Sequence, residues 1–221
     1  MKPRERIATA RIPGGTEELQ LWRHDSDYTL RLGRIEVMST RVHGSEEQLA
    51  ELALAARKAP AANVLIGGLG MGFTLARVLA LVGPAARVEV AELVPEVIAW
   101  NRELVGDCAG HPLRDARVVV HEGDVAERIA TAGRVFDVIL LDVDNGPEGL
   151  VRGANVGLYD RRGLARAAKA LRPGGVFALW SSAPDPHFAR RLRDAGFRVT
   201  QHDVRARGHK GPRRTIWTGC V

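Results

Sequence analysis

Hydrophobic and polar positions alternate in short runs over the first part of the chain. An apolar run at 19–22 is followed by a polar turn, and two further runs, 28–32 and 35–38, lie on either side of Gly33. Short alternating runs with turn residues between them are typical of antiparallel strands. The pattern therefore predicts a small N-terminal β element over residues 1–44, either a β-hairpin or a three-stranded meander.

From Ser45 onward the apolar positions follow helical spacing, and the chain then alternates between strands and helices. Ser45 is the predicted N-cap of the first helix, and Gln48 occupies the capping-box position. The predicted strands cover residues 63–66, 87–91, 117–121, 136–142, 176–180, 198–203 and 215–218. The helices predicted between them cover residues 73–81, 95–105, 125–130, 161–171 and 187–195.

Several of these strands are nearly continuous apolar runs, as in FDVILLD at 136–142. Such runs are typical of parallel strands that are covered on both faces. Alternating strands and helices of this kind predict an α/β domain over residues 45–221, with a doubly wound, Rossmann-like sheet of seven strands. Because the loop before the last strand contains no predicted helix, that strand is expected to pair antiparallel.

The composition is that of a globular protein of 221 residues, with 45% apolar and 26% charged residues. Its two cysteines, Cys108 and Cys220, exclude a disulfide-rich scaffold and a cysteine-rich zinc site. The seven histidines form no metal-binding motif, so no metal is expected. No apolar stretch reaches the ~20 residues that span a bilayer. We therefore expect a cytoplasmic protein without a membrane partner.

The net charge of +6 is concentrated near the C-terminus. Residues 205–214 (RARGHKGPRR) contain four arginines, one lysine and no acid, so they carry +5 of this charge. Such a segment can bind an anionic partner or be a solvated loop between two strands, and the sequence leaves both interpretations open. Nucleic acid is a less favoured partner than a small molecule, because no recognition module accompanies the basic residues.

A glycine-rich turn follows the first predicted strand of the α/β domain. Gly67, Gly68, Gly70 and Gly72 allow the backbone to turn tightly and to approach a ligand closely, next to the free N–H groups that begin the following helix. Twenty residues after Gly72, the next strand ends at Glu92, where an acidic side chain can accept both hydroxyl groups of a ribose. This spacing predicts a nucleotide site.

Two further acidic residues end predicted strands. Asp124 follows the third strand of the domain and Asp142 ends the fourth. Ligands of open α/β sheets bind outside the carboxyl ends of the strands, so both residues are expected beside Glu92. Asp124 can also be the N-cap of the next helix. Asp144, two residues after Asp142, is either a turn residue or a group that orients or deprotonates a nucleophile.

Successive motifs along nearly the whole chain resemble those of spermidine synthases. They are VLIGGLGMGF, VEVAELVPEV, VHEGDVAERI and FDVILLDVDNGPEG, with SEEQLAELAL before them and GPRRTIWTG near the end. Spermidine synthases are aminopropyltransferases built on the fold of class I S-adenosylmethionine-dependent methyltransferases. The resemblance implies that fold for residues 45–221, and it implies a homodimer, which would also cover an exposed edge of the N-terminal strands.

The resemblance also implies the contacts of an S-adenosylmethionine-type cofactor. The turn at 68–72 would pass the amino-acid portion of the cofactor, and Glu92 would hold the ribose. Asp124 would face the adenine amino group. Leu93 and Val125, which adjoin these acids in the sequence, are expected to line the same cofactor site.

Three substrate positions depart from the spermidine synthase pattern. Gly70 stands where the synthases have an aspartate that holds the ammonium group of the donor, and Asn145 stands where they have the aspartate that is the base. Ala50 stands where their N-terminal helix has a tyrosine. A backbone turn accommodates the ammonium and carboxylate of S-adenosylmethionine better than an unpaired cation. We therefore expect methyl transfer from S-adenosylmethionine.

The expected acceptor is a small molecule bound near Asp142 and Asp144, and an amine is one candidate for it. Tyr159 falls where the synthases have a tyrosine near the substrate loop, so the candidate catalytic residues are Asp142, Asp144 and Tyr159. The main alternative is aminopropyl transfer from decarboxylated S-adenosylmethionine. A protein that binds a nucleotide without catalysis, in a regulatory role, is a further alternative, as is a nicotinamide-dependent dehydrogenase.

Overall fold

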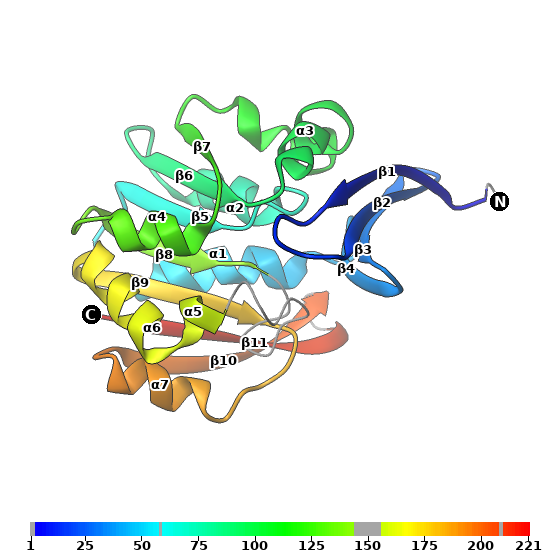
Figure 1. The fold of residues 1–221 in the computed structure, drawn as a ribbon. Coiled ribbons are helices and arrows are strands. Elements are labelled where there is room, and N and C mark those ends of the chain that lie inside the picture. The colour runs from blue at the N-terminus through cyan, green and yellow to red at the C-terminus, as the bar shows by residue number, and fades with distance from the viewer. Residues whose placement is uncertain (1–2, 58, 144–155, 208–209) are drawn as a thin grey trace.

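A four-stranded antiparallel sheet forms the N-terminal part of the computed structural model, which describes residues 3–57, 59–143, 156–207 and 210–221. The strands follow chain order: β1 (Glu5–Arg11), β2 (Glu18–His24), β3 (Asp27–Leu32) and β4 (Ile35–Ser39). Figure 1 shows this sheet beside the larger part of the molecule. The sequence pattern does not predict β1, because its residues (ERIATAR) include few large apolar side chains and the strand depends on pairing with β2.

Cross-strand pairing gives the N-terminal sheet one apolar face. In β2 and β3, Leu19 lies opposite Leu32 and Leu21 lies opposite Leu30. Residues directly opposite one another in an antiparallel pair point to the same face. Leu21, Leu30 and Leu32 are buried. The leucine face is therefore packed against other parts of the molecule and is not a solvated surface.

The rest of the chain builds a seven-stranded sheet in the order β10-β11-β9-β8-β5-β6-β7. The strands are β5 (Asn63–Gly67), β6 (Arg87–Glu92), β7 (Val118–Glu122), β8 (Phe136–Leu141), β9 (Leu171–Ser181), β10 (Arg198–Arg207) and β11 (Lys210–Cys220). The pairs from β9 to β7 are parallel, whereas β11 is antiparallel to both β9 and β10. The predicted α/β fold with an antiparallel last strand is confirmed.

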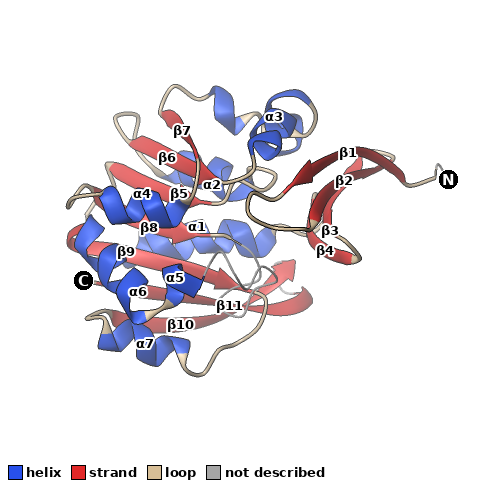
Figure 2. Ribbon diagram, in the orientation of Figure 1, coloured by secondary structure: helices blue, strands red, loops and turns tan. Residues whose placement is uncertain are grey.

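Helices cover both faces of this sheet, as Figure 2 shows. They are α1 (Gly44–Ala56), α2 (Phe73–Leu81), α3 (Pro95–Glu103), α4 (Val125–Thr131), α5 (Val156–Tyr159), α6 (Arg161–Ala170) and α7 (Phe188–Asp194), with short 3-10 turns at Gly106–Ala109 and Pro112–Arg114. Successive residues of β5 enter different cores: Val64 and Ile66 pack with α1–α3, and Leu65 packs with α4–α7. Burial on both faces explains the continuous apolar runs in the strands.

The first helix begins differently from the prediction. Its N-cap is His43, not Ser45. The Ser45 hydroxyl donates a hydrogen bond of 2.6 Å to Oε2 of Glu46, and both residues are buried. The predicted cap is therefore wrong, because a buried carboxylate takes the hydroxyl that would otherwise cap the helix.

The basic segment 205–214 lies mostly in paired strands. Arg205 pairs with Arg213, and Arg207 pairs with Lys210, across β10 and β11. The interpretation of this segment as a loop is therefore wrong for the described residues, and an anionic partner stays a prediction. The division into residues 1–44 and 45–221 also stays a prediction. Within the described ranges, none of the helices is long and apolar enough to cross a membrane.

A buried carboxylate ties together the amino ends of β5 and β8. Asp137 in β8 is 2% exposed, and its Oδ2 accepts hydrogen bonds of 2.8 Å from the backbone N–H groups of Ala62 and Asn63. Its other oxygen lies 2.8 Å from the Arg57 guanidinium, just after α1. This carboxylate therefore joins the amino ends of β5 and β8 to the residue that follows α1, at the edge of the sheet opposite the strands' carboxyl ends.

Candidate active site

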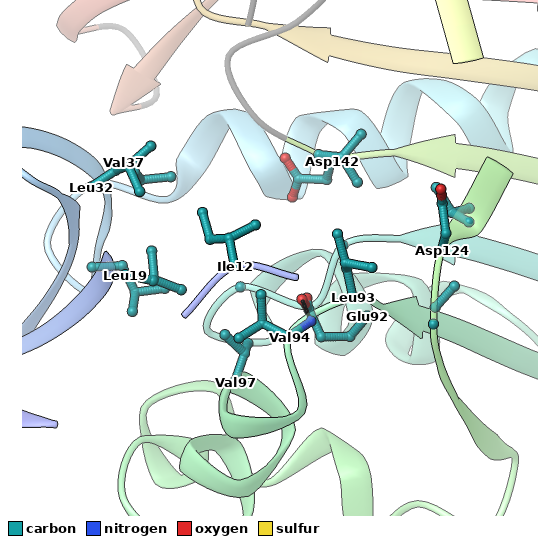
Figure 3. Close-up of a pocket in the computed structure, with 17 residues that line it drawn as sticks. Ile12, Leu19, Leu32, Val37, Glu92, Leu93, Val94, Val97, Asp124 and Asp142 are labelled. Carbon is teal, nitrogen blue, oxygen red and sulfur yellow. Dashed lines mark hydrogen bonds between the residues drawn. The ribbon is translucent and has the colours of Figure 1, made fainter. Parts of the chain in front are cut away.

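A pocket of about 150 Å³ lies at the carboxyl ends of the central strands, between them and the N-terminal sheet (Figure 3). Its lining residues are Ile12, Leu19, Leu30, Leu32, Val37, Gly68, Gly70, Ala91, Glu92, Leu93, Val94, Val97, Gly123, Asp124, Val125, Asp142 and Val143. The carboxyl ends of parallel strands are where open α/β sheets bind ligands. The pocket therefore has the position that the strand-end acids predict.

The glycine turn after β5 needs a glycine at position 68. Gly68 has a φ of +87°, and a Cβ there would lie 2.5 Å from the carbonyl oxygen of Asp142. Its N–H donates to the carbonyl of Ala91 at 2.8 Å. The ends of β5, β6 and β8 thus meet closely at this glycine, which also lines the pocket.

Glu92 is held firmly at the end of β6. Its two carboxylate oxygens accept hydrogen bonds from the backbone N–H groups of Leu69, at 2.8 Å, and Val94, at 2.9 Å. The side chain is 8% exposed and lines the pocket. Because a carboxylate can accept about four hydrogen bonds, Glu92 can bind these N–H groups and still accept from a ligand hydroxyl.

Asp124 is confirmed as a helix cap, and its contact with a ligand stays a prediction. It is the N-cap of α4, where its carboxylate accepts from the N–H of Ala126 at 2.7 Å, and it lines the pocket. Leu93 and Val125 also line the pocket, and their contact with a cofactor stays a prediction. Gly67 ends β5 and Gly72 is the N-cap of α2, and neither is among the lining residues.

Asp142 directly follows the end of β8, and a hydroxyl from α2 holds its carboxylate. Its Oδ2 accepts a hydrogen bond of 2.6 Å from the hydroxyl of Thr74 in α2. Removal from water, and then repulsion from the Glu46 carboxylate, raises the pKa of Asp142 to about 7, against the effect of the Thr74 hydrogen bond. Asp142 is thus a pocket carboxyl group that titrates near neutral pH.

Residues of the N-terminal part complete the site, and the sequence reasoning missed them. Met38 of β4 accepts a hydrogen bond from the N–H of Met71 through its sulfur, at 3.2 Å. Its terminal carbon lies 2.8 Å from the point where a Cβ at Gly70 would stand. At position 70, where the synthases have an aspartate, this chain therefore has a glycine, and the side chain of Met38 packs against it. The alternation of Leu30 and Leu32 in β3 was the available signal for the apolar wall.

Of the other two predicted catalytic residues, the structure describes Tyr159 but not Asp144. Tyr159, at the end of α5, is 4% exposed and donates a hydrogen bond of 3.4 Å to the carbonyl of Val143, next to Asp142. It is not among the lining residues, and its catalytic role stays a prediction. Asp144 lies outside the described residues. Within those residues, no group of three or more histidine, cysteine or acidic side chains is arranged to hold a metal ion.

The chain is similar to polyamine-forming enzymes. The family model of the spermine/spermidine synthase domain matches residues 42–191, more than half of the chain. A polyamine aminopropyltransferase of Prochlorococcus marinus (strain AS9601) is 27% identical over 124 residues, which are 56% of this chain and 42% of that protein. The match thus spans less than half of the relative's length.

Solved structures of spermidine synthases share the fold. The spermidine synthase from Thermotoga maritima and a spermidine synthase in complex with the transition-state analogue AdoDATO each superpose with a TM-score of 0.77 at 18% identity, covering 97% of this chain and 72% of theirs. A probable spermidine synthase from Corynebacterium glutamicum ATCC 13032 gives 0.61 at 20% identity, over 96% of this chain and 79% of that one.

These findings overturn the expectation of methyl transfer. The matching family and the curated relative are aminopropyltransferases, so the assignment as a methyltransferase is wrong and its aminopropyltransferase alternative fits better. The expectation gave most weight to the absence of an aspartate at position 70, where the synthases hold the ammonium group of the donor. It could not include Glu46, which folding brings close enough to raise the pKa of Asp142. The chain belongs to the spermine/spermidine synthase family.

Proposed function

We propose that this protein transfers the aminopropyl group of decarboxylated S-adenosylmethionine to an amine. Its family supports this class of reaction. The observation that carries the proposal is the carboxyl group of Asp142, which lines the pocket at the end of β8 and is held there by the Thr74 hydroxyl. A pocket lined by the three acidic residues Glu92, Asp124 and Asp142 favours a cationic ligand, and the aminopropyl group ends in an ammonium.

The residues around the pocket suit the rest of this donor. Gly68 and Gly70 line the pocket and carry no side chain, so the chain of the donor can lie close to their backbone. Glu92 would accept the ribose hydroxyl groups, and Asp124 with Val125 would lie against the adenine. Asp142, Glu92 and Asp124 stand at the ends of β8, β6 and β7, and Figure 3 shows all three around the pocket.

The acceptor is expected to be an amine with an aliphatic body. Ile12, Leu19, Leu32 and Val37 form an apolar wall opposite the strand-end acids (Figure 3). Such a wall stabilises methylene groups by about 0.8 kcal/mol for each one buried. It would contact the carbon chain of the acceptor or of the donor, while the charged ends point to the acids.

The reaction needs positioning more than covalent help. The neutral acceptor nitrogen forms a bond to the methylene carbon attached to the sulfonium sulfur, and the carbon–sulfur bond breaks with its electron pair going to sulfur. The products are the aminopropylated amine, 5′-methylthioadenosine and a proton. Holding the two reactants in line supplies most of the rate. Asp142 would hold the donor, and Asp144, outside the described residues, is the candidate for accepting the proton.

The experiment is an assay for 5′-methylthioadenosine. The purified protein is incubated with decarboxylated S-adenosylmethionine and, in separate reactions, with diamines and alkyl monoamines of increasing length. We expect amine-dependent release of 5′-methylthioadenosine and none with S-adenosylmethionine. Asp142→Asn is expected to lower kcat/KM by about 100-fold or more, since it removes the counter-charge.

A matched control variant makes this result specific. Asp203→Asn makes the same chemical change on an exposed residue of β10 and is expected to retain full activity. Methyl transfer from S-adenosylmethionine, or binding of the donor without product in any acceptor mixture, would overturn the proposed function.

A further inference from the structure

The basic residues of this chain gather in its last third, which the proposed function does not use. Residues 156–221 contain 14 arginines and lysines and four acidic residues, whereas residues 1–155 contain 18 and 22. The segment 205–214 supplies five of the 14 cations. Figure 1 shows that α6, α7, β10 and β11, coloured from yellow to red, lie together on the lower side of the molecule. This side is therefore strongly cationic.

The pairing of β10 with β11 puts like charges opposite one another. Arg205 pairs with Arg213, and Arg207 pairs with Lys210. All four residues are exposed. Like charges that lie directly opposite in an antiparallel pair are destabilising. These pairs therefore lower the stability of the hairpin, and the fold itself does not account for them.

The cations of this hairpin have no acidic partners. The guanidinium of Arg205 donates to the backbone carbonyl of Gly211 at 3.1 Å, and that of Arg214 donates to the carbonyl of Arg213 at 3.1 Å. Arg214 also lies over the ring of Trp180. Among the residues that the structure describes, no carboxylate oxygen lies within 4.0 Å of an arginine or lysine of β10 or β11. The charge of the hairpin is therefore available to an anionic ligand.

The same side of the sheet carries further cations on α7 and α6. Gln201 of β10 lies opposite Trp217, which packs against Phe188 of α7 with ring centroids 5.0 Å apart. Arg205 follows Gln201 by four residues in a regularly paired stretch, so it points to the side of the sheet that α7 covers. Helix α7 packs in turn against α6. Together with Arg205 and Arg213, the exposed basic residues of these helices form what we call the basic surface: Arg161, Arg162, Arg166, Lys169, Arg190 and Arg193.

Few acids oppose this charge. Of the four acidic residues in 156–221, Asp160 caps α6 and Asp185 pairs with Arg191 at 2.6 Å. The other two are Asp194 and Asp203. The pocket, in contrast, is lined by three acids and suits a cationic ligand. The basic surface therefore suits a different ligand from the one in the pocket.

The scarcity of exposed apolar side chains on this side narrows the class of partner. Among the described residues, the large apolar side chains that are exposed are Ile35, Leu81, Leu104 and Val135, all of which precede residue 156. The centre of a protein interface is apolar or aromatic, and a membrane-binding surface inserts apolar side chains. Proteins that bind single-stranded nucleic acid stack its bases on aromatic rings. The phosphates of a duplex need none of these, because charge alone binds them.

We propose that the basic surface binds the phosphate backbone of double-stranded nucleic acid without reading its sequence. Its cations replace the counterions of the phosphates, and the release of those counterions drives binding. Such binding needs no recognition module, since contacts to phosphates carry no sequence information. Strand β10 has 10 residues, so at about 3.3 Å for each residue it is about 33 Å long, close to the ~34 Å of one duplex turn. This inference does not depend on the proposed function.

The experiment measures the binding of two labelled DNA duplexes of unrelated sequence by fluorescence anisotropy, at salt concentrations from about 50 mM to about 200 mM. For the natural protein we expect a Kd of about 1–100 μM near 150 mM salt, equal for the two duplexes, and a steep loss of affinity as salt rises. Arg213→Glu is expected to weaken binding by about five- to tenfold and to reduce the slope of log K against log salt by about 1.

Arg213→Glu also separates a loss of binding from a loss of folding. It places a negative charge opposite Arg205, so the urea midpoint of unfolding is expected to stay the same or to rise while the affinity falls. Arg34→Glu makes the same change on an exposed residue of the N-terminal part and is the matched control. Because its charge lies away from the basic surface and is screened by salt, the control is expected to change Kd by less than about twofold.

Three results would overturn the proposal. One is a Kd that does not change with salt, and another is an equal loss of affinity in Arg213→Glu and Arg34→Glu. The third is tighter binding of phosphatidylserine-rich vesicles or of a polyglutamate peptide than of the duplexes, because it would assign the basic surface to a membrane or to an acidic protein.

Discussion

At the scale of single residues, Gly68 allows the backbone at the ends of β5 and β8 to approach closely beside the pocket. Its φ of +87° is strained for a residue with a side chain, and a Cβ would meet the carbonyl of Asp142 at 2.5 Å. We expect Gly68→Ala to destabilise the fold by about 1–3 kcal/mol and to abolish detectable donor binding in calorimetry. Gly83→Ala, where a Cβ would meet nothing within 4 Å, is the control. Normal donor binding by Gly68→Ala would contradict the requirement for a glycine at this position of the pocket.

At the scale of elements, Asp137 joins β5, β8 and the end of α1. Asp137→Ala would remove the buried carboxylate that accepts from the N–H groups of Ala62 and Asn63 and that pairs with the Arg57 guanidinium. We expect a loss of about 3–5 kcal/mol in the free energy of unfolding, measured by urea denaturation. Asp115→Ala breaks the more exposed pair with Arg117 and is expected to cost no more than about 1 kcal/mol. Equal losses in the two variants would disprove this difference.

At the scale of the whole molecule, the two sheets share the pocket. Leu32 of β3 is 5% exposed and lines it, whereas Ile35 of β4 is 45% exposed. We expect Leu32→Ala to weaken ligand binding, as Kd for the donor or KM for the amine, by about tenfold, because buried methylene groups lose their contacts. Ile35→Ala is expected to change neither constant. An unchanged affinity in Leu32→Ala would show that the wall does not contact either substrate.

The strand edges of the molecule bear on its assembly. The N-terminal sheet has β1 and β4 at its edges, and the larger sheet has β10 and β7. Unpaired strand edges favour association with a second chain, and the homodimer implied by the resemblance stays a prediction. Light scattering on the purified protein tests it, and a monomer at micromolar concentration would contradict it.

The sequence alone was sufficient for the features that depend on neighbouring residues. The periodicity of apolar positions predicts the α/β fold, and α2 has the predicted bounds, Phe73–Leu81. The glycine turn, Glu92, Asp124 and Asp142 were predicted to share one edge because the carboxyl ends of parallel strands meet there. The pocket brings these acids together. Each of these residues stands at the end of its own strand. The local sequence pattern and the rule that ligands bind at the carboxyl ends of parallel strands were therefore enough to predict where these residues lie.

The tertiary structure alone decided which groups complete the site. Met38 and the leucine wall come from a sheet whose orientation against the α/β domain depends on packing over many contacts. The hydroxyl of Thr74 in α2 contacts both the Asp142 carboxylate and the backbone carbonyl of Glu46 in α1, and this contact depends on the packing of the two helices. The apparent lack of negative charge in the sequence favoured the wrong donor. Charge at a buried site depends on which side chains folding brings together and removes from water, and spacing along the chain does not specify that.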